Sequence, residues 1–95
     1  MEIEHSCKYI KNYSKIESIQ IEHQIVYSAF EQNDGVLLQL VHIQKTFQKS
    51  VKCFCDNLSV KQAKNLLLFF YENSVSIENF QDILQDYNVR FNLLT

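Results

Sequence analysis

The chain lacks proline entirely and has a single glycine, Gly35, among its 95 residues. This composition excludes flexible Gly- or Pro-rich linkers and the glycine-rich loops that bind phosphate groups. With 46% hydrophobic residues and no such linker, we expect residues 1–95 to form a single domain. We expect that domain to consist mostly of regular structure with short connections.

A strong excess of charge and a long apolar run are missing as well. Nine basic and eleven acidic residues give a net charge of −2, which indicates neither a nucleic-acid-binding protein nor an acidic DNA mimic. The longest apolar run, residues 66–71, is far shorter than the ~20 residues that span a membrane. Because the polar, acidic start also lacks the features of a signal peptide, we predict a cytoplasmic protein without a membrane association.

The cysteine count is odd, and without an export signal it favours reduced thiols. On a strand, Cys53 and Cys55 would face the same way, so both sulfurs could reach one metal ion. Further ligands could come from His5, Cys7, His23 and His42. None of these has the spacing of a typical zinc site, and we therefore interpret Cys53 and Cys55 as buried free thiols. A metal-binding protein remains an alternative, and no cofactor is expected.

The first half of the chain, about residues 2–56, shows strand patterns. Residues 18–30 alternate in a period of two and include β-branched and aromatic side chains, while residues 2–10 do so more weakly. Asp34-Gly35 then predicts a tight hairpin turn that uses positive φ. Residues 36–44 are apolar on both faces, which predicts a central strand, and residues 51–55 predict a short one.

The second half contains a pattern that occurs twice, seventeen residues apart. A serine, Ser59 or Ser76, is followed in each copy by apolar residues at helical spacing. The pattern predicts helices at about 60–73 and 77–88, the first capped by Ser59 and Gln62. Residues 88–95 fit either a strand or a continued helix.

Strands followed by helices predict an α+β fold. We expect an antiparallel sheet of three to four strands, followed by a C-terminal α-helical hairpin packed on one face. The side chains expected to cover the sheet are Ala63, Leu66, Leu67, Phe70, Phe80, Ile83, Leu84 and Tyr87.

Two surface features of the helices go beyond what this packing needs. Leu68 and Phe69 point well away from the apolar stripe of the first helix, so they are buried by the second helix and the tail or form a binding patch together with Tyr71. Glu78, Asp82 and Asp86, four residues apart, would share one helix face. That face is either simply solvated or a contact for a basic partner surface.

The remaining polar clusters, of lysine and of histidine, indicate neither a phosphate-binding site nor a catalytic site. Five lysines between residues 45 and 64 could contact phosphate, but the absence of arginine among them favours a solubilising surface. The three histidines fall on predicted strands without a nucleophile motif nearby, so we expect no enzymatic activity.

The run between Cys55 and Tyr87, about a third of the chain, resembles a family of small uncharacterised proteins from low-GC Gram-positive bacteria. The matching residues are Ser59, Glu72, Asn73, Ser76, Asp82 and Asp86. The resemblance implies strands, a helix, a turn around Glu72-Asn73 and a second helix. It implies no activity.

These observations lead to a hypothesis of a small, non-catalytic protein-binding module that regulates or inhibits a larger macromolecular partner. Its anchors would be Leu68, Phe69 and Tyr71, and its charged rim Glu78, Asp82 and Asp86. One alternative is a phage or mobile-element inhibitor of a host defence nuclease, of the anti-CRISPR type. Others are a structural homodimer and a metal-binding protein that uses Cys53 and Cys55.

Overall fold

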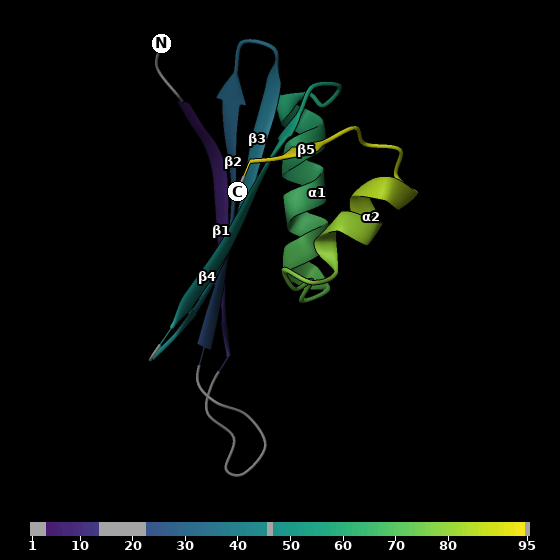
Figure 1. The fold of residues 1–95 in the computed structure, drawn as a ribbon. Helices are drawn as coiled ribbons and strands as arrows, with labels where there is room; N and C mark the ends of the chain where they lie inside the picture. Colours follow the sequence, from purple (N-terminus) through teal and green to yellow (C-terminus); the bar gives the residue numbers. More distant parts are fainter. Residues whose placement is uncertain (1–3, 14–22, 46, 95) are drawn as a thin grey trace.

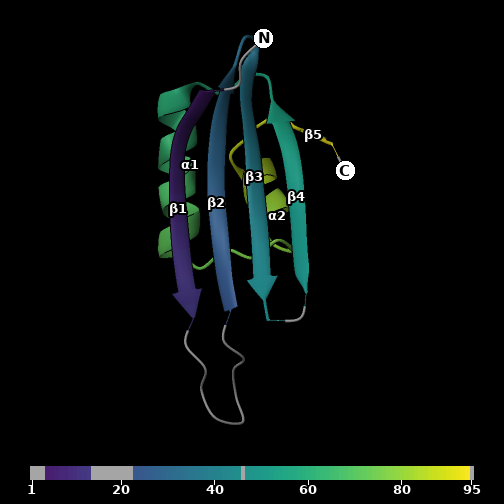
Figure 2. The same ribbon diagram turned by 90° about the vertical axis from the view of Figure 1, so that its left-hand side faces the viewer.

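The computed structural model describes residues 4–13, 23–45 and 47–94, and it contains five strands and two helices in these segments. The elements in chain order are β1 (Glu4–Tyr13), β2 (His23–Gln32), β3 (Gly35–Gln44), β4 (Gln48–Cys55), α1 (Val60–Glu72), α2 (Phe80–Asp86) and β5 (Asn92–Leu93). The strands form one antiparallel sheet in the order β1-β2-β3-β4-β5, as Figure 2 shows. The fold is therefore α+β.

Both helices lie on the same side of the sheet (Figure 1). Figure 2 views the opposite side, and no described helix or strand lies in front of the four long strands there. The side chains that face the helices are the core of the molecule. They include Tyr27 on β2, Leu38 on β3 and Cys53 on β4, all with 0% exposure. The molecule thus has two layers, with one face of the sheet covered.

The β2–β3 hairpin is confirmed, but the reason for its glycine is different from the expected one. Asn33 and Asp34 form the turn, and Gly35 pairs with Gln32 as the first residue of β3. Gly35 does not have a positive φ. A Cβ at this position would instead collide with the carbonyl oxygen of Cys55 and with the Cα of Asp56. The glycine therefore permits a close approach of β3 to the end of β4.

Helix α1 begins as the sequence predicts. The Ser59 Oγ accepts a hydrogen bond from the Gln62 N–H (3.1 Å), and the Gln62 Oε1 accepts one from the Ser59 N–H (2.9 Å). This capping box satisfies two backbone donors that a helix end leaves unpaired. Along the helix, Ala63, Leu66, Leu67 and Phe70 are buried against the sheet, as expected.

The second helix is shorter than predicted, and the helical hairpin is not confirmed. The Ser76 carbonyl accepts from the backbone N–H groups of both Asn79 and Phe80, which makes residues 77–79 a turn and delays α2 to Phe80. The packing prediction also differs at Tyr87, which is 56% exposed because the helix ends at Asp86 and Tyr87 no longer faces the sheet. Ile83 is half-buried and packs against the core, as expected.

Both helices end with a left-handed residue followed by a valine. Ser74 has φ 53° and Asn88 has φ 58°. The next residue closes each helix end, with the Val75 N–H donating to the Phe70 carbonyl and the Val89 N–H to the Leu84 carbonyl. This geometry satisfies helix-end carbonyls and turns the chain back toward the core.

The tail after α2 forms a fifth strand, which decides the ambiguity of residues 88–95 for the described part. Leu93 pairs with Cys53 on β4, and the Leu94 N–H donates a 3.0 Å hydrogen bond to the Lys52 carbonyl. The strand is two residues long and covers part of the β4 edge. Neither described helix is long and apolar enough to cross a membrane.

Candidate interaction surfaces

A groove lies between α1 and the segment that follows α2. Its volume is about 360 Å³, and its lining residues are Leu58, Gln62, Asn65, Leu66, Phe69, Tyr87 and Val89. Gln62, Asn65, Leu66 and Phe69 are spaced three or four residues apart, so they lie on one side of α1, and Leu58 directly precedes the helix cap. The Phe69 and Tyr87 rings meet edge to face, with centroids 6.0 Å apart. The groove is therefore mostly apolar, with two amide side chains, and it is large enough for one or two side chains of a partner.

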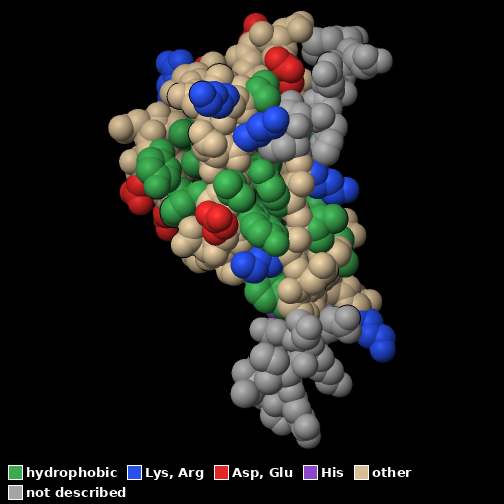
Figure 3. Space-filling view, turned by 180° about the vertical axis from the view of Figure 1, so that it is seen from behind, with side chains coloured by type: hydrophobic (Ala, Val, Ile, Leu, Met, Phe, Trp, Pro, Cys, Tyr) green, Lys and Arg blue, Asp and Glu red, His purple; other side chains and the backbone are tan. Residues whose placement is uncertain are grey.

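The three predicted anchor residues do not form one patch. Phe69 lines the groove and is half-buried, while Leu68 is 38% exposed. Tyr71 lies at the β1 edge instead, where its ring packs against Tyr9 at 5.7 Å between centroids. Figure 3 draws the face of the molecule that lies behind the view of Figure 1. Hydrophobic side chains gather across the middle of that face, with charged side chains around and among them.

Tyr71 packs within the molecule, against β1, and this contact explains why an aromatic residue stands at that position of α1. The Lys11 Nζ donates a 3.0 Å hydrogen bond to the Tyr71 carbonyl and lies 5.0 Å from the centre of the Tyr71 ring. A cation in this position is attracted both by the carbonyl and by the aromatic face. Lys11 and Tyr71 thus tie β1 to the end of α1.

The predicted acidic stripe is only partly on one helix. Asp82 and Asp86 are exposed on α2, four residues apart, but Glu78 precedes the helix. The Glu78 carboxylate accepts a 3.0 Å hydrogen bond from the Lys49 Nζ, which lowers its pKa. Among the described residues, no salt bridge involves Asp82 or Asp86. Asp86 directly precedes Tyr87, one of the residues that line the groove.

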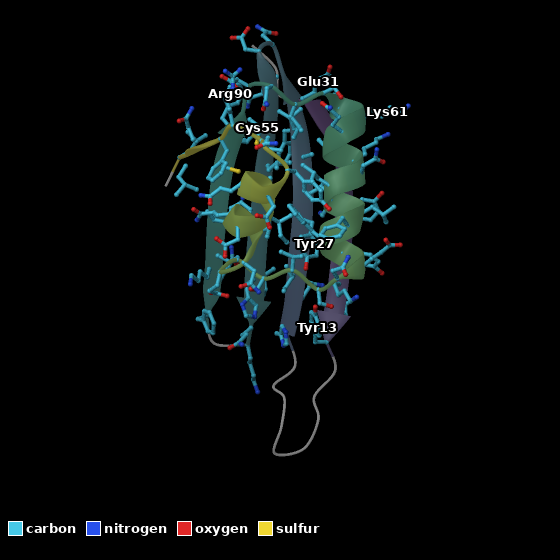
Figure 4. All side chains as sticks on the ribbon, turned by 90° about the vertical axis from the view of Figure 1, so that its right-hand side faces the viewer. Tyr13, Tyr27, Glu31, Cys55, Lys61 and Arg90 are labelled. Carbon is cyan, nitrogen blue, oxygen red and sulfur yellow. The ribbon has the colours of Figure 1, made fainter. Side chains whose placement is uncertain are left out.

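The two thiols of β4 are buried and face the helices, as Figure 4 shows for Cys55. The Cys53 thiol hydrogen-bonds to Cys55, and this contact together with burial raises the pKa of Cys53. No group of three or more His, Cys, Asp or Glu side chains in the described segments is arranged to hold a metal ion. The side chains of His5 and Cys7, two of the proposed further ligands, lie outside the described part of the chain.

The other two histidines lie near each other at the end of the sheet where β3 leads into β4. The His23 ring stacks on Tyr13 with centroids 4.3 Å apart and lies 5.0 Å from the His42 ring. The Nε2 atom of His42 is buried and has no hydrogen-bond partner among the described residues. Burial lowers the pKa of His42, and the neighbouring His23 and Lys49 lower it further, while Glu78 opposes them.

The lysines between residues 45 and 64 do not share a surface. Lys49 faces the helix side and Lys52 the opposite side of the sheet, because they are an odd number of residues apart on β4. Lys61 projects away from α1 into solvent (Figure 4). Lys49, Lys52 and Lys61 therefore point in different directions and do not form one positive patch.

Sequence reasoning missed a second surface, which we call the open sheet face. It is the side of β1–β4 turned away from the helices (Figure 2). Its apolar side chains are Ile10, Val26, Phe30, Leu37, Val41, Ile43 and Phe54. The signal was present on β3, whose apolar residues on both faces predicted a central strand. β3 is central, but the described residues cover only one of its faces.

In comparisons with protein-family models, curated proteins and solved structures, the chain matches none of them.

Proposed function

We propose that the protein is a non-catalytic protein-binding module that regulates or inhibits a larger partner through the groove between α1 and Tyr87–Val89. The observation that supports this most directly is the exposure of Tyr87, 56%, at the rim of an apolar groove. Large aromatic side chains next to a small pocket are the residues that dominate binding energy at protein interfaces. Phe69, one of the three anchors predicted from the sequence, supplies the floor beside it.

The charge next to the groove indicates the chemistry of the partner. Asp86 precedes Tyr87, and Asp82 lies one turn earlier on the exposed side of α2. Two carboxylates without described ion partners favour a segment that carries an apolar side chain flanked by Lys or Arg. Such a pairing adds electrostatic steering to apolar contact, and its strength falls with salt concentration.

The first experiment is quantitative capture from a lysate of the source cells, using the wild type, Tyr87→Ala and the double variant Asp82→Lys/Asp86→Lys. The control is Lys64→Glu, which changes a charge at an exposed position of α1 that does not line the groove. A protein that binds the groove is recovered with the wild type and the control, and its recovery is reduced with both groove variants. Recovery of the same proteins at the same level by all four forms would contradict the proposal.

The second experiment measures the affinity for the partner so identified, at about 50 and 500 mM salt. We expect Tyr87→Ala to weaken binding by about 2 kcal/mol or more, as at other interface hot spots. The double charge reversal should weaken binding mainly at low salt, because screening removes the steering at high salt. A salt-independent effect of the reversal would remove the electrostatic part of the proposal.

A further inference from the structure

The open sheet face has more apolar surface than a solvated sheet needs. In an antiparallel sheet with one wet face, the outward positions are normally polar. Here Val26 and Val41 are direct cross-strand neighbours at its centre, and Ile10 pairs with Val26 on the other side. Towards one end, Phe30, Leu37 and Phe54 form a second apolar row across three strands, in which Leu37 is already buried at 8% exposure and the other two are half-buried. The polar row of Ser28 and Gln39 lies between the two apolar rows. Apolar side chains at outward positions of central strands favour a face that packs against another layer.

The charges of this face are few and lie at its sides. Lys8 on β1 and Lys52 on β4 flank a row whose central members, Ser28 and Gln39, are neutral. Among the described side chains of the face there is no carboxylate. An identical face can therefore be placed opposite without burying an unpaired charge at its centre, since long lysine side chains at the margin can extend into solvent.

We infer that the occupant of the open sheet face is a second copy of this chain, packed sheet on sheet to form a four-layered homodimer. Strands of ten residues are ~33 Å long, and four of them are ~19 Å wide, so the face covers roughly 600 Å². Two copies would bury ~1,200 Å², which reaches the lower limit of stable protein–protein interfaces. Twisted sheets of this kind pack at about −30° with their side chains interdigitated.

The dimer has a consequence for the groove. Both helices of each copy lie on the side of the sheet away from the dimer interface (Figure 1). The two grooves therefore remain accessible on opposite outer surfaces. The dimer is then a bivalent particle, which binds a partner with repeated sites more tightly than a single groove does. The homodimer itself does not depend on the function proposed for the groove.

The test is the molar mass of the purified full chain by size-exclusion chromatography with light scattering, from about 5 to about 500 µM. We expect the wild type to dimerise within this range, and more strongly at high salt, because the lysines at the margin carry like charges. The double variant Val26→Thr/Val41→Thr keeps the shape and the strand preference of both residues but makes the centre polar. It should weaken dimerisation at least tenfold while its thermal unfolding stays cooperative.

Val41→Asp should abolish the dimer altogether, and Lys64→Asp on the exposed side of α1 is its control. A wild type that is monomeric at about 500 µM would overturn the inference. So would a dimer that survives both sheet variants, because another surface would then form it. A monomer that binds single-stranded nucleic acid, with an affinity that falls as salt rises, would overturn it in favour of a different occupant.

Discussion

The hydroxyl of Tyr27, in the centre of the sheet, donates a 2.7 Å hydrogen bond to the backbone carbonyl of Val75. Tyr27 is fully buried, and Val75 belongs to the connection between the two helices, 48 residues away in the sequence. Val75 also closes the end of α1 through its own N–H. A single side chain of β2 thus fixes the point at which the chain leaves α1 and turns toward α2.

Tyr27→Phe is expected to destabilise the protein by about 1–2 kcal/mol, because it removes this hydrogen bond and leaves a buried carbonyl unpaired. The free energy of unfolding is measured by urea denaturation, with Tyr87→Phe as the control for loss of an exposed hydroxyl. Equal stability of the two variants would mean that the Tyr27 hydroxyl does not hold the connection.

Gly35→Ala is expected to cost about 1–3 kcal/mol, the range for forcing extra atoms into a packed site. The added Cβ would displace the end of β4 at Cys55 and Asp56, although the backbone conformation itself suits any residue. Asn33→Ala, at the exposed turn of the same hairpin, controls for the loss of turn propensity. A larger cost at Asn33 than at Gly35 would contradict the close-approach explanation.

Ser74→Gly is expected to stabilise the protein by up to about 1 kcal/mol, because glycine adopts positive φ without the steric cost of a side chain. Asn88→Gly, at the equivalent position after α2, should gain less, since asparagine tolerates this conformation better than serine does. Thermal and urea unfolding of the two variants and the wild type give the comparison. A destabilised Ser74→Gly variant would show that contacts of the serine side chain stabilise the fold by more than its positive φ destabilises it.

The stability of the protein is expected to fall as the pH is lowered through the ordinary pKa of histidine, near 6.5. His42 has a lowered pKa in the folded state. As the pH falls, His42 is therefore protonated first in the unfolded chain, and this protonation favours the unfolded state over the folded one. The loss continues until the pH passes the folded-state pKa and then levels off. His42→Gln should flatten the stability profile in this interval, measured as unfolding free energy between about pH 5 and 7.5.

Glu78→Gln is the matched control for the pH experiment. Its carboxyl has a lowered pKa because of Lys49, so its contribution to stability is present above the unfolded-state value of 4.5 and is lost below it. This variant should change the profile at the acidic end, and it should keep the slope near pH 6.5, because without the Glu78 charge the pKa of His42 is lowered further. A Glu78→Gln variant that flattened the profile near pH 6.5 would show that His42 is not the responsible group.

The helix start at Ser59 and the β2–β3 hairpin were predictable because their causes are local. A serine that caps a helix and a two-residue turn are set by neighbours within four residues. The cap was found where the sequence indicated, and the hairpin was found with its turn one residue earlier, at Asn33-Asp34. The late start of α2 was not predictable. Ser76 has the sequence of a helix cap, yet its carbonyl closes a turn that is held by the connection packed on Tyr27.

The sequence by itself determined the strand periods, the cap of α1 and the class of the fold, because hydrophobic spacing and backbone hydrogen bonding act over short distances along the chain. Only the tertiary structure decided that Phe69 and Tyr87 meet in a groove, that Tyr71 belongs to the β1 edge and that one face of the sheet stays open. These relationships depend on which elements pack together, and that choice depends on the shape and area of surfaces far apart in the sequence. On β3, the apolar side chains of Val36, Leu38 and Leu40 belong to the core, whereas those of Leu37, Val41 and Ile43 lie on the side turned away from the helices.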